Sequence, residues 1–299
     1  GGSGFLSGTL ARRAISQNHQ VWTVTRGQRP LPKGVTGLTT NRKNRRLFER
    51  VLKGANTKFD LVIDCIGYDP EDARTDIAVF RSLTSHVIFV STDFVYDPAF
   101  RVFPQSEEAK RYTTEGYGGK KRLCEIEFLN NKTEDLAWTI VRPCHIYGPG
   151  SLLGCIPLHS RDPHLLSKIK NGETLHLVGG GHFLQQPILA RDLSDLILSL
   201  EGNTNAYSET FCATGPDTVE SREYYRIIAK LIGAPDPNIE EIPITHHLSA
   251  NPDSKPFLCH RIYNISKLKS CGAKVPKTSL YDGLQEHIKS LLAEESKTR

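Results

Sequence analysis

The first half of the chain alternates between short apolar runs and longer amphipathic segments. Apolar runs of this length are typical of strands buried in a parallel sheet, and apolar residues spaced three and four apart are typical of helices that pack on one. The sequence therefore predicts strands at 20–24, 37–40, 59–68, 86–92 and 138–142, with helices at 5–19, 47–52, 72–83 and 117–129. This regular alternation predicts an α/β fold around a parallel sheet.

The pattern changes after residue 150 to loops and shorter elements. We predict a helix at 165–169, strands at 175–178 and 211–215, and a helix at 221–232. A chain of 299 residues can bury a sizeable core, so we expect one compact body or two interlocked lobes.

Tyr117 and Lys121 stand one helical turn apart. On a helix they share a face, so the ammonium group could lower the pKa of the phenol, which could then exchange a proton with a hydroxyl or carbonyl group. A second such pair, Tyr263 and Lys267, makes the spacing alone unspecific. Only Tyr117 follows an apolar strand that ends in a hydroxyl, at Thr92, and ligands of open α/β sheets bind at such strand ends. We therefore interpret Tyr117 as functional and Tyr263 as structural.

The order of these features resembles the extended short-chain dehydrogenase/reductase family, which contains nucleotide-sugar epimerases and dehydratases. The most specific string is Arg-Pro-Cys-His-Ile-Tyr-Gly-Pro-Gly at 142–150. The resemblance implies a Rossmann doubly wound parallel sheet in residues 1–150, which would bind a dinucleotide. It also implies a smaller C-terminal α+β substrate lobe in residues 151–299, with 184–210 returning to the Rossmann domain.

The same resemblance implies hydride-transfer chemistry. Tyr117 would take a proton from a sugar hydroxyl, Thr92 would align the reacting oxygen, and Lys121 would favour the phenolate while both Tyr117 and Lys121 contact the cofactor. Dehydratases of the family carry Asp-Glu after the threonine, whereas this chain has Asp93-Phe94, which disfavours dehydration. Epimerisation of a sugar nucleotide is our first expectation, and NADPH-dependent reduction of a 4-keto-sugar is the alternative.

The N-terminal glycines are predicted to bind the cofactor's diphosphate. Gly1, Gly4 and Ser7 occupy the positions of the family's G-x-x-G-x-x-G loop, with serine in place of the third glycine. Such a loop places a pyrophosphate at a helix N-terminus, here next to Phe5 and Leu6. A Rossmann unit needs a strand before this loop and the sequence has none, so we expect the first residues to be missing. An engineered Gly-Gly-Ser-Gly linker is the alternative.

The remaining cofactor contacts follow from the strand ends. Residues 25–29 contain Arg26 but no carboxylate for the ribose hydroxyls, which predicts NADP, with NAD as second choice. The resemblance places Asn41 beside the adenine, Gly67 under the ribose and nicotinamide, and Pro143 against the nicotinamide face.

Three residues are predicted to bind substrate. Asp93 follows the catalytic threonine, although a loop carboxylate that caps backbone amides is the alternative. His145 lies in the family string and has no partner at metal-ligand spacing, so we predict no metal site. Arg261 stands where sugar-nucleotide relatives place an arginine against the diphosphate, and a surface arginine is the alternative.

Composition and charge argue against other functional classes and locations for the protein. The net charge of +5 is spread along the chain, and the densest basic run, at 42–46, is more typical of a solvated helix face than of an RNA or phosphate site. Seven scattered cysteines and the lack of a long apolar run predict a cytoplasmic protein without disulfides, bound to no membrane. A homodimer is one expected assembly.

A non-catalytic alternative also follows from the resemblance. Some relatives with this fold bind RNA, as the chloroplast stem-loop-binding proteins do, and these tend to lose the tyrosine and lysine pair. The presence of Tyr117 and Lys121 favours catalysis, so nucleic acid is the second hypothesis and a small-molecule substrate the first.

Overall fold

The computed structural model describes residues 1–131, 135–155 and 161–298. Its largest sheet has four parallel strands in the order β10 (Glu209–Ala213), β5 (Ala137–Pro143), β4 (His86–Val90) and β3 (Val62–Asp64). A separate parallel pair consists of β1 (Val21–Thr25) and β2 (Val35–Thr39). All five residues of β4 are buried, as its apolar run predicts for the centre of a parallel sheet. The predicted α/β fold with a parallel sheet is confirmed.

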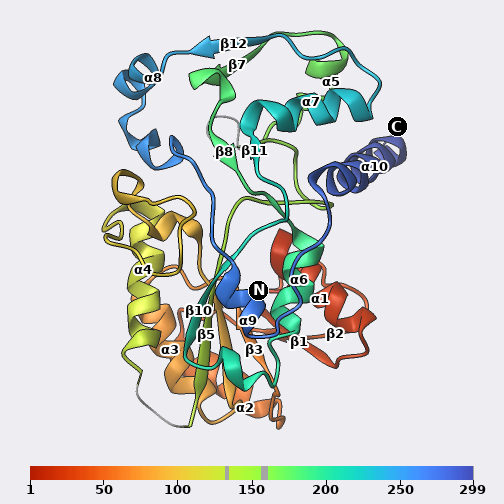
Figure 1. Ribbon diagram of the computed structural model, residues 1–299. Helices are drawn as coiled ribbons and strands as arrows, with labels where there is room; N and C mark the ends of the chain where they lie inside the picture. The colour runs from red at the N-terminus through yellow and green to blue at the C-terminus, as the bar shows by residue number, and fades with distance from the viewer. Residues whose placement is uncertain (132–134, 156–160, 299) are drawn as a thin grey trace.

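Helices cover both faces of this sheet (Figure 1). On one face α3 (Pro70–Phe80) packs against α4 (Gly116–Leu129), and on the other α1 (Phe5–Ser16) packs against α6 (Ala190–Leu198). The short helix α2 (Arg45–Gly54) follows β2. An ion pair between Arg13 Nε and Asp195 Oδ1, 2.8 Å apart, joins α1 to α6. Chain from beyond residue 184 thus supplies a helix and the strand β10 to this lobe.

A second lobe lies above the sheet in Figure 1 and has an apolar core of its own, with Leu175, Tyr224 and Leu284 among its members. The remaining helices and strands, most of them in this lobe, are β6 (Ile146–Tyr147), α5 (Leu165–Lys170), β7 (Leu175–Val178), β8 (Leu184–Gln185), β9 (Ile188–Leu189), β11 (Val219–Glu220), α7 (Ser221–Leu231), β12 (Ile239–Ile242), α8 (Ile244–Ala250), α9 (Ser266–Ser270) and α10 (Leu280–Thr298). Among the helices of the described part of the chain, none combines the length and the hydrophobicity needed to cross a bilayer.

Two elements differ from the sequence-based expectation. The strand predicted at 59–68 is regular only over Val62–Asp64. The residues after it form a loop, because the amides of Ile66 and Tyr68 donate hydrogen bonds to carboxylate side chains. The long helix α10 was not anticipated, since Gly283 in its first turn weakens the helical pattern. The structure explains this glycine, because a Cβ there would lie 2.1 Å from the Tyr147 hydroxyl.

Candidate active site

The three predicted catalytic side chains meet at the carboxyl end of β4. Tyr117 lies in the first turn of α4, and its phenol is close enough to the Thr92 side chain for Thr92 to lower the pKa of the phenol. Lys121, one turn along the helix and only 1% exposed, donates from Nζ to the carbonyl oxygens of Gly67 at 2.9 Å and Val90 at 2.7 Å. The site therefore joins residues from α4, β4 and the loop after β3.

The phenol is more strongly protonated than the sequence suggests. Burial raises the pKa of Tyr117 to about 12, the neighbouring Tyr68 and Asp93 act in the same direction, and the hydrogen bond from Thr92 opposes them. Burial also lowers the pKa of Lys121. The expected lowering of the phenol's pKa by Lys121 is not found: the groups that most shift this pKa are Tyr68, Asp93 and Thr92, and Lys121 is turned to the carbonyl groups of Gly67 and Val90.

A close backbone contact explains one glycine at the start of α4. A Cβ on Gly118 would lie 2.0 Å from the carbonyl oxygen of Phe94, in the 3₁₀ turn η1 (Asp93–Val95) that follows Thr92. The glycine thus lets the helix approach the strand end closely enough for Tyr117 to reach Thr92.

A buried polar network fixes the same face of α4 to the sheet. The carboxylate of Glu125 is fully buried, accepts a hydrogen bond from Ser91 Oγ at 2.6 Å, and pairs with Nε and Nη2 of Arg142 at 2.8 Å each. Tyr117, Lys121 and Glu125 are spaced by four residues and so share one face of the helix. We did not single out Glu125 from the sequence, although a carboxylate in the buried stripe of a helix is a usable signal.

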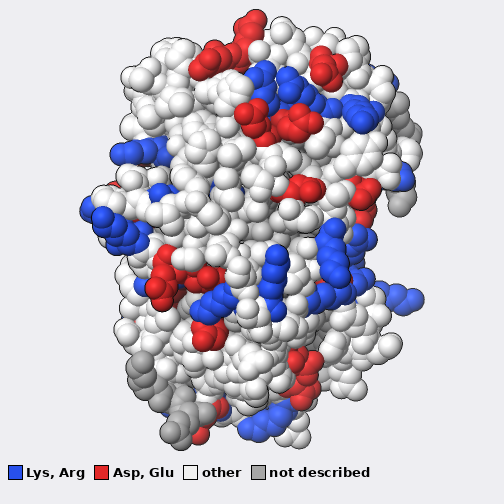
Figure 2. All heavy atoms as spheres, in the orientation of Figure 1, with Lys and Arg blue, Asp and Glu red and all other residues white. Residues whose placement is uncertain are grey.

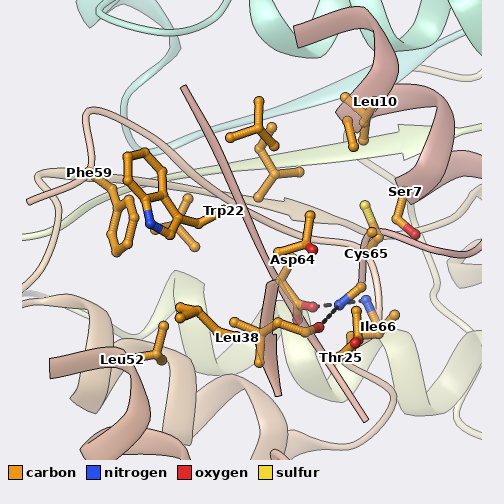
Figure 3. Close-up of a pocket in the computed structure, with 18 of the residues that line it drawn as sticks. Ser7, Leu10, Trp22, Thr25, Leu38, Leu52, Phe59, Asp64, Cys65 and Ile66 are labelled. Atoms are coloured by element: carbon orange, nitrogen blue, oxygen red, sulfur yellow. Dashed lines mark hydrogen bonds between the residues drawn. The ribbon is translucent and has the colours of Figure 1, made fainter. Parts of the chain in front are cut away.

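A groove of about 1050 Å³ runs between β1 and β3 (Figure 3). One end is bordered by Ser7, Cys65 and Ile66, and the other by Trp22 and Phe59, whose ring centroids are 5.6 Å apart. In a doubly wound sheet of order 3-2-1-4-5-6, the position between these two strands is that of the first strand. We therefore assign only the end near the glycine loop to a dinucleotide.

Four of the predicted cofactor residues line this groove, namely Gly1, Gly4, Arg26 and Asn41. The others do not line it: Phe5 and Leu6 lie in the first turn of α1, Gly67 and Lys121 bind each other, Tyr117 is on α4, and Pro143 ends β5 in a buried position. Tyr68, next to Gly67, does line the groove and is 50% exposed, so it joins the groove to the Tyr117 site.

The glycine-loop end has the features that a dinucleotide requires. The first-turn amides of α1 have no partner within the helix and point toward its N-terminal side. Ser7, in place of the third glycine, accepts a hydrogen bond from the Gly4 amide at 3.2 Å and so stabilises the turn. Thr40 Oγ1 borders the groove, is buried and has no hydrogen-bond partner among the described residues. These groups fit a polar, phosphate-bearing ligand.

The sequence of residues 1–207 matches the profile of the NAD dependent epimerase/dehydratase family. The chain belongs to this family.

Individual relatives agree with this membership. A chloroplast stem-loop binding protein of 41 kDa from Arabidopsis thaliana is 25% identical over 300 residues, which cover 96% of this chain and 76% of that protein. A UDP-glucose 4-epimerase from Thermotoga maritima, solved with UDP-glucose, has a TM-score of 0.75 at 18% identity over 99% of this chain and 98% of its own. A dTDP-glucose 4,6-dehydratase from Bacillus anthracis, solved with NAD, has a TM-score of 0.77 at 18% identity over 99% and 96%. The two structures establish that the Rossmann-type fold of the family is shared.

Of the three residues predicted to bind substrate, two form a buried ion pair with each other and the third, His145, lies near an aromatic ring. Asp93 and Arg261 are 2% and 0% exposed and form an ion pair with each other, and the Tyr263 hydroxyl donates to Asp93 Oδ2 at 2.5 Å. His145 lies with its ring centroid 6.5 Å from that of Tyr224. Burial lowers the pKa of His145 to about 4, and the charge of Arg161 acts in the same direction. The histidine is therefore neutral at physiological pH.

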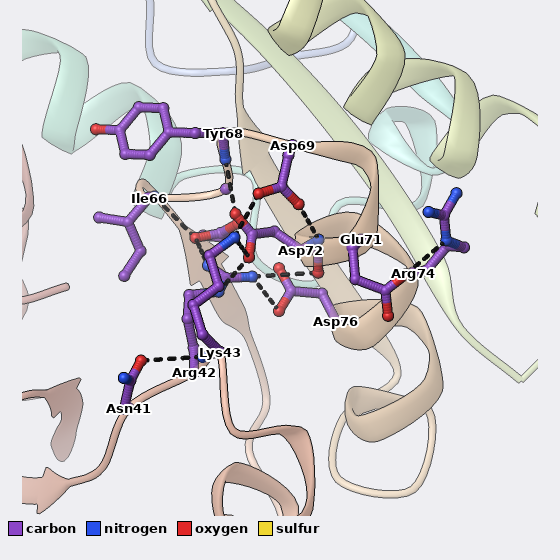
Figure 4. Close-up of polar contacts among 12 residues, drawn as sticks. Asn41, Arg42, Lys43, Ile66, Tyr68, Asp69, Glu71, Asp72, Arg74 and Asp76 are labelled. Carbon is purple, nitrogen blue, oxygen red and sulfur yellow. Dashed lines mark hydrogen bonds and ion pairs between the residues drawn. The ribbon is translucent and has the colours of Figure 1, made fainter.

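A charged cluster organises the loop beside the groove (Figure 4). Arg42 donates to Asp64 Oδ1 at 3.0 Å and to Asp76 Oδ1 at 2.8 Å, and Lys43 Nζ lies 2.8 Å from Asp72 Oδ1. Asp64 and Asp72 in turn accept the amides of Ile66 and Tyr68. The first two cations of the basic run at 42–46 are thus neutralised by buried carboxylates. Asn41 accepts from the Lys43 amide at 3.0 Å.

One carboxyl of this cluster gives a testable pH dependence. Burial and the neighbouring charge of Asp64 raise the pKa of Asp76 well above its ordinary value. As the pH rises through the window between the ordinary and the raised pKa, the folded protein keeps a proton that the unfolded chain loses, so stability falls. We expect Asp76→Asn, whose amide oxygen can still accept from Arg42, to flatten this fall and to be at least as stable as the wild type at pH 7.

Denaturant unfolding at several pH values between 4 and 8 would measure this effect. Asp253→Asn, at an exposed position, is the control and should leave the pH profile unchanged. A profile for Asp76→Asn that parallels the wild-type profile would show that Asp76 does not keep this proton in the folded protein.

Within the described residues, no group of three or more His, Cys, Asp or Glu side chains could hold a metal ion. All seven cysteines are free.

Proposed function

We propose that this chain is an NAD(P)-dependent sugar-nucleotide epimerase or oxidoreductase of the extended short-chain dehydrogenase type. The observation that carries the proposal is the position of the Tyr117 phenol beside the Thr92 side chain at a strand end, with Lys121 buried one turn away. Family membership and the folds of the UDP-glucose 4-epimerase and dTDP-glucose dehydratase support it.

The proposed mechanism gives Tyr117, Thr92 and Lys121 separate roles. A bound nicotinamide dinucleotide supplies the acceptor or donor of hydride. Tyr117 removes the proton from a sugar hydroxyl in the oxidising direction, or gives one to a carbonyl oxygen in the reducing direction. Thr92 holds the reacting oxygen in line with the phenol. Lys121 uses two of its three donors on the carbonyl groups of Gly67 and Val90, which leaves one donor for the cofactor side of the site.

The test of this proposal is a panel of sugar nucleotides and keto-sugars, each assayed with NAD(H) and NADP(H). Absorbance of the reduced cofactor and the stereochemistry of the product separate the two reactions. An epimerase returns the hydride to the other face of a keto intermediate and shows no net cofactor consumption, whereas a reductase consumes one equivalent. A chain that binds neither cofactor would contradict the proposal.

We propose NADP as the preferred cofactor because of Arg26. This residue follows β1, lines the glycine-loop end of the groove and is exposed, and no ion pair occupies it within the described residues. A guanidinium here can pair with a 2′-phosphate. We expect Arg26→Ala to weaken NADPH binding by roughly 10- to 100-fold, the worth of a charge-assisted hydrogen bond, and to leave NADH binding unchanged.

Fluorescence titration with NADPH and with NADH would measure the two affinities. Arg45→Ala, on the exposed side of α2, is the control that removes equal charge away from the groove. Equal losses for NADPH and NADH in Arg26→Ala would show that Arg26 does not read the 2′-phosphate.

We propose indirect roles in substrate binding for Asp93, Arg261 and His145. Because Asp93 and Arg261 neutralise each other in a buried pair, we propose that they shape the cleft next to Thr92. His145, neutral and next to Tyr224, would offer a hydrogen bond without charge.

Binding of a nucleic-acid stem-loop is the second candidate function, favoured by the relative from Arabidopsis thaliana and by exposed Arg45 and Arg46 on α2. Basic and acidic side chains are mixed over most of the face drawn in Figure 2, and several basic side chains lie close together right of its middle. If this function is correct, wild-type binding to a stem-loop RNA should fall steeply with salt, Lys121→Ala should keep this binding, and Arg45→Glu with Arg46→Glu should abolish it. No binding by the wild type would exclude it.

A further inference from the structure

The Tyr117 ring belongs to a group of four aromatic rings, with those of Tyr68, Phe94 and Phe257. The Tyr117 ring centroid lies 6.3 Å from that of Tyr68 and 6.1 Å from that of Phe94. Phe257, in the 3₁₀ segment η5 (Pro252–Phe257) of the C-terminal half, packs edge-on to Phe94 with centroids 5.0 Å apart. Residues from distant parts of the chain thus form one aromatic wall beside the phenol.

The wall is apolar although charged groups lie behind it. The Arg261 guanidinium carbon lies 4.1 Å from the Phe94 ring centroid, and this arginine is paired with Asp93 and fully buried. The stacked guanidinium fixes Phe94 from one side. Tyr68 and Tyr117 are each about half exposed, at 50% and 51%, while Phe94 and Phe257 are partly buried. Large aromatic surface is therefore left uncovered at the reacting hydroxyl.

Uncovered aromatic surface next to a few placed polar groups is the usual lining of a small-molecule site. A pyranose ring presents a face of C–H groups as well as a rim of hydroxyls, so one side of it can lie on aromatic carbon while the rim reaches Tyr117 and Thr92. An open-chain polyol has no such face. Aromatic contacts of this kind contribute through buried apolar area.

Resting on the proposed function, we propose that Phe94 and Phe257 contact the C–H face of a pyranose ring held at Tyr117, and that Phe257 is a specificity-determining residue. Phe257 touches neither the glycine loop nor the groove lining, so its contribution concerns the sugar alone. Phe94 has a double role, because it also packs against the catalytic phenol.

The experiment compares the affinities of UDP-glucose and UDP for the full chain saturated with NADH, measured by calorimetry. The ratio of the two dissociation constants isolates the contribution of the sugar ring. We expect Phe257→Ala to lower this ratio by about tenfold and Phe257→Leu to lower it less, with UDP affinity unchanged in both. Phe183→Ala, a partly buried aromatic that contacts His260, is the matched control and should keep the wild-type ratio.

The outcomes separate this inference from the function on which it rests. Two results would show that the aromatic rings do not bind the sugar while leaving the cofactor assignment intact. One is a wild-type chain that binds NADH but gains no affinity from the glucose group, and the other is a Phe257→Ala variant with the wild-type ratio. A wild-type chain that binds neither NADH nor NADPH overturns both.

Discussion

Replacement of Tyr117 by phenylalanine is expected to lower kcat by about 10²- to 10⁴-fold, the usual worth of a positioned acid-base group. The ring keeps its contacts with Phe94 and Tyr68, so folding and cofactor affinity should be unchanged. Only the proton that the phenol exchanges with the substrate is lost. Steady-state kinetics with the best substrate of the panel, together with cofactor titration, would measure both quantities.

Tyr68→Phe is the matched control, because Tyr68 is a second half-exposed phenol next to the same site. Its loss of a hydroxyl should change kcat by less than about tenfold. Retention of wild-type kcat by Tyr117→Phe would remove the tyrosine from the mechanism.

The pKa of about 12 also fixes the sign of the pH dependence. If Tyr117 is the base of the oxidising reaction, kcat should rise with pH up to the pKa of the phenol. If it is the acid of the reducing reaction, kcat should stay level and fall only near that pKa. A bound cofactor that lowers the pKa would move both limbs to lower pH without changing their signs.

Removal of the Glu125 carboxylate is expected to have the largest effect on stability. Burial opposes the charge of Glu125, yet Arg142 holds its pKa below the ordinary value, so the pair is ionised in the folded protein. Glu125→Ala would leave the charge of Arg142, 2% exposed, without the carboxylate that neutralises it. We expect the free energy of unfolding to fall by about 3–5 kcal/mol. Denaturant unfolding at pH 7 would measure it.

Two further variants test whether the loss of stability comes from an unpaired buried charge. Glu49→Ala breaks the exposed pair with Lys53 and should leave the free energy of unfolding almost unchanged. Glu125→Leu combined with Arg142→Leu removes both charges and should recover much of the loss, because no buried charge is left unpaired. A loss below about 1 kcal/mol for Glu125→Ala would mean that water reaches Arg142 in the folded protein.

Local patterns in the sequence were sufficient for the sheet and for the main catalytic candidates. The apolar run of β4 predicts a central parallel strand because every one of its side chains is covered. The spacing of Tyr117 and Lys121 predicts that they share a helix face, since that follows from helical geometry alone. Family membership follows from the order of such motifs.

The sequence could not predict which residues far apart in the chain contact each other. Asp93 and Arg261 are separated by more than half of the chain, so only the folded structure could show that they neutralise each other. The same holds for Phe257 beside Phe94, and for Glu125, whose partner Arg142 comes from the neighbouring strand.

By itself, then, the sequence determined the fold class and the strand end at which Thr92, Tyr117 and Lys121 gather, because these depend on period and spacing along the chain. The tertiary structure decided the state of these groups. It set the pKa of Tyr117 and the partners of Asp93 and Arg261, because burial and charge neutralisation depend on which side chains the packed lobes bring within contact.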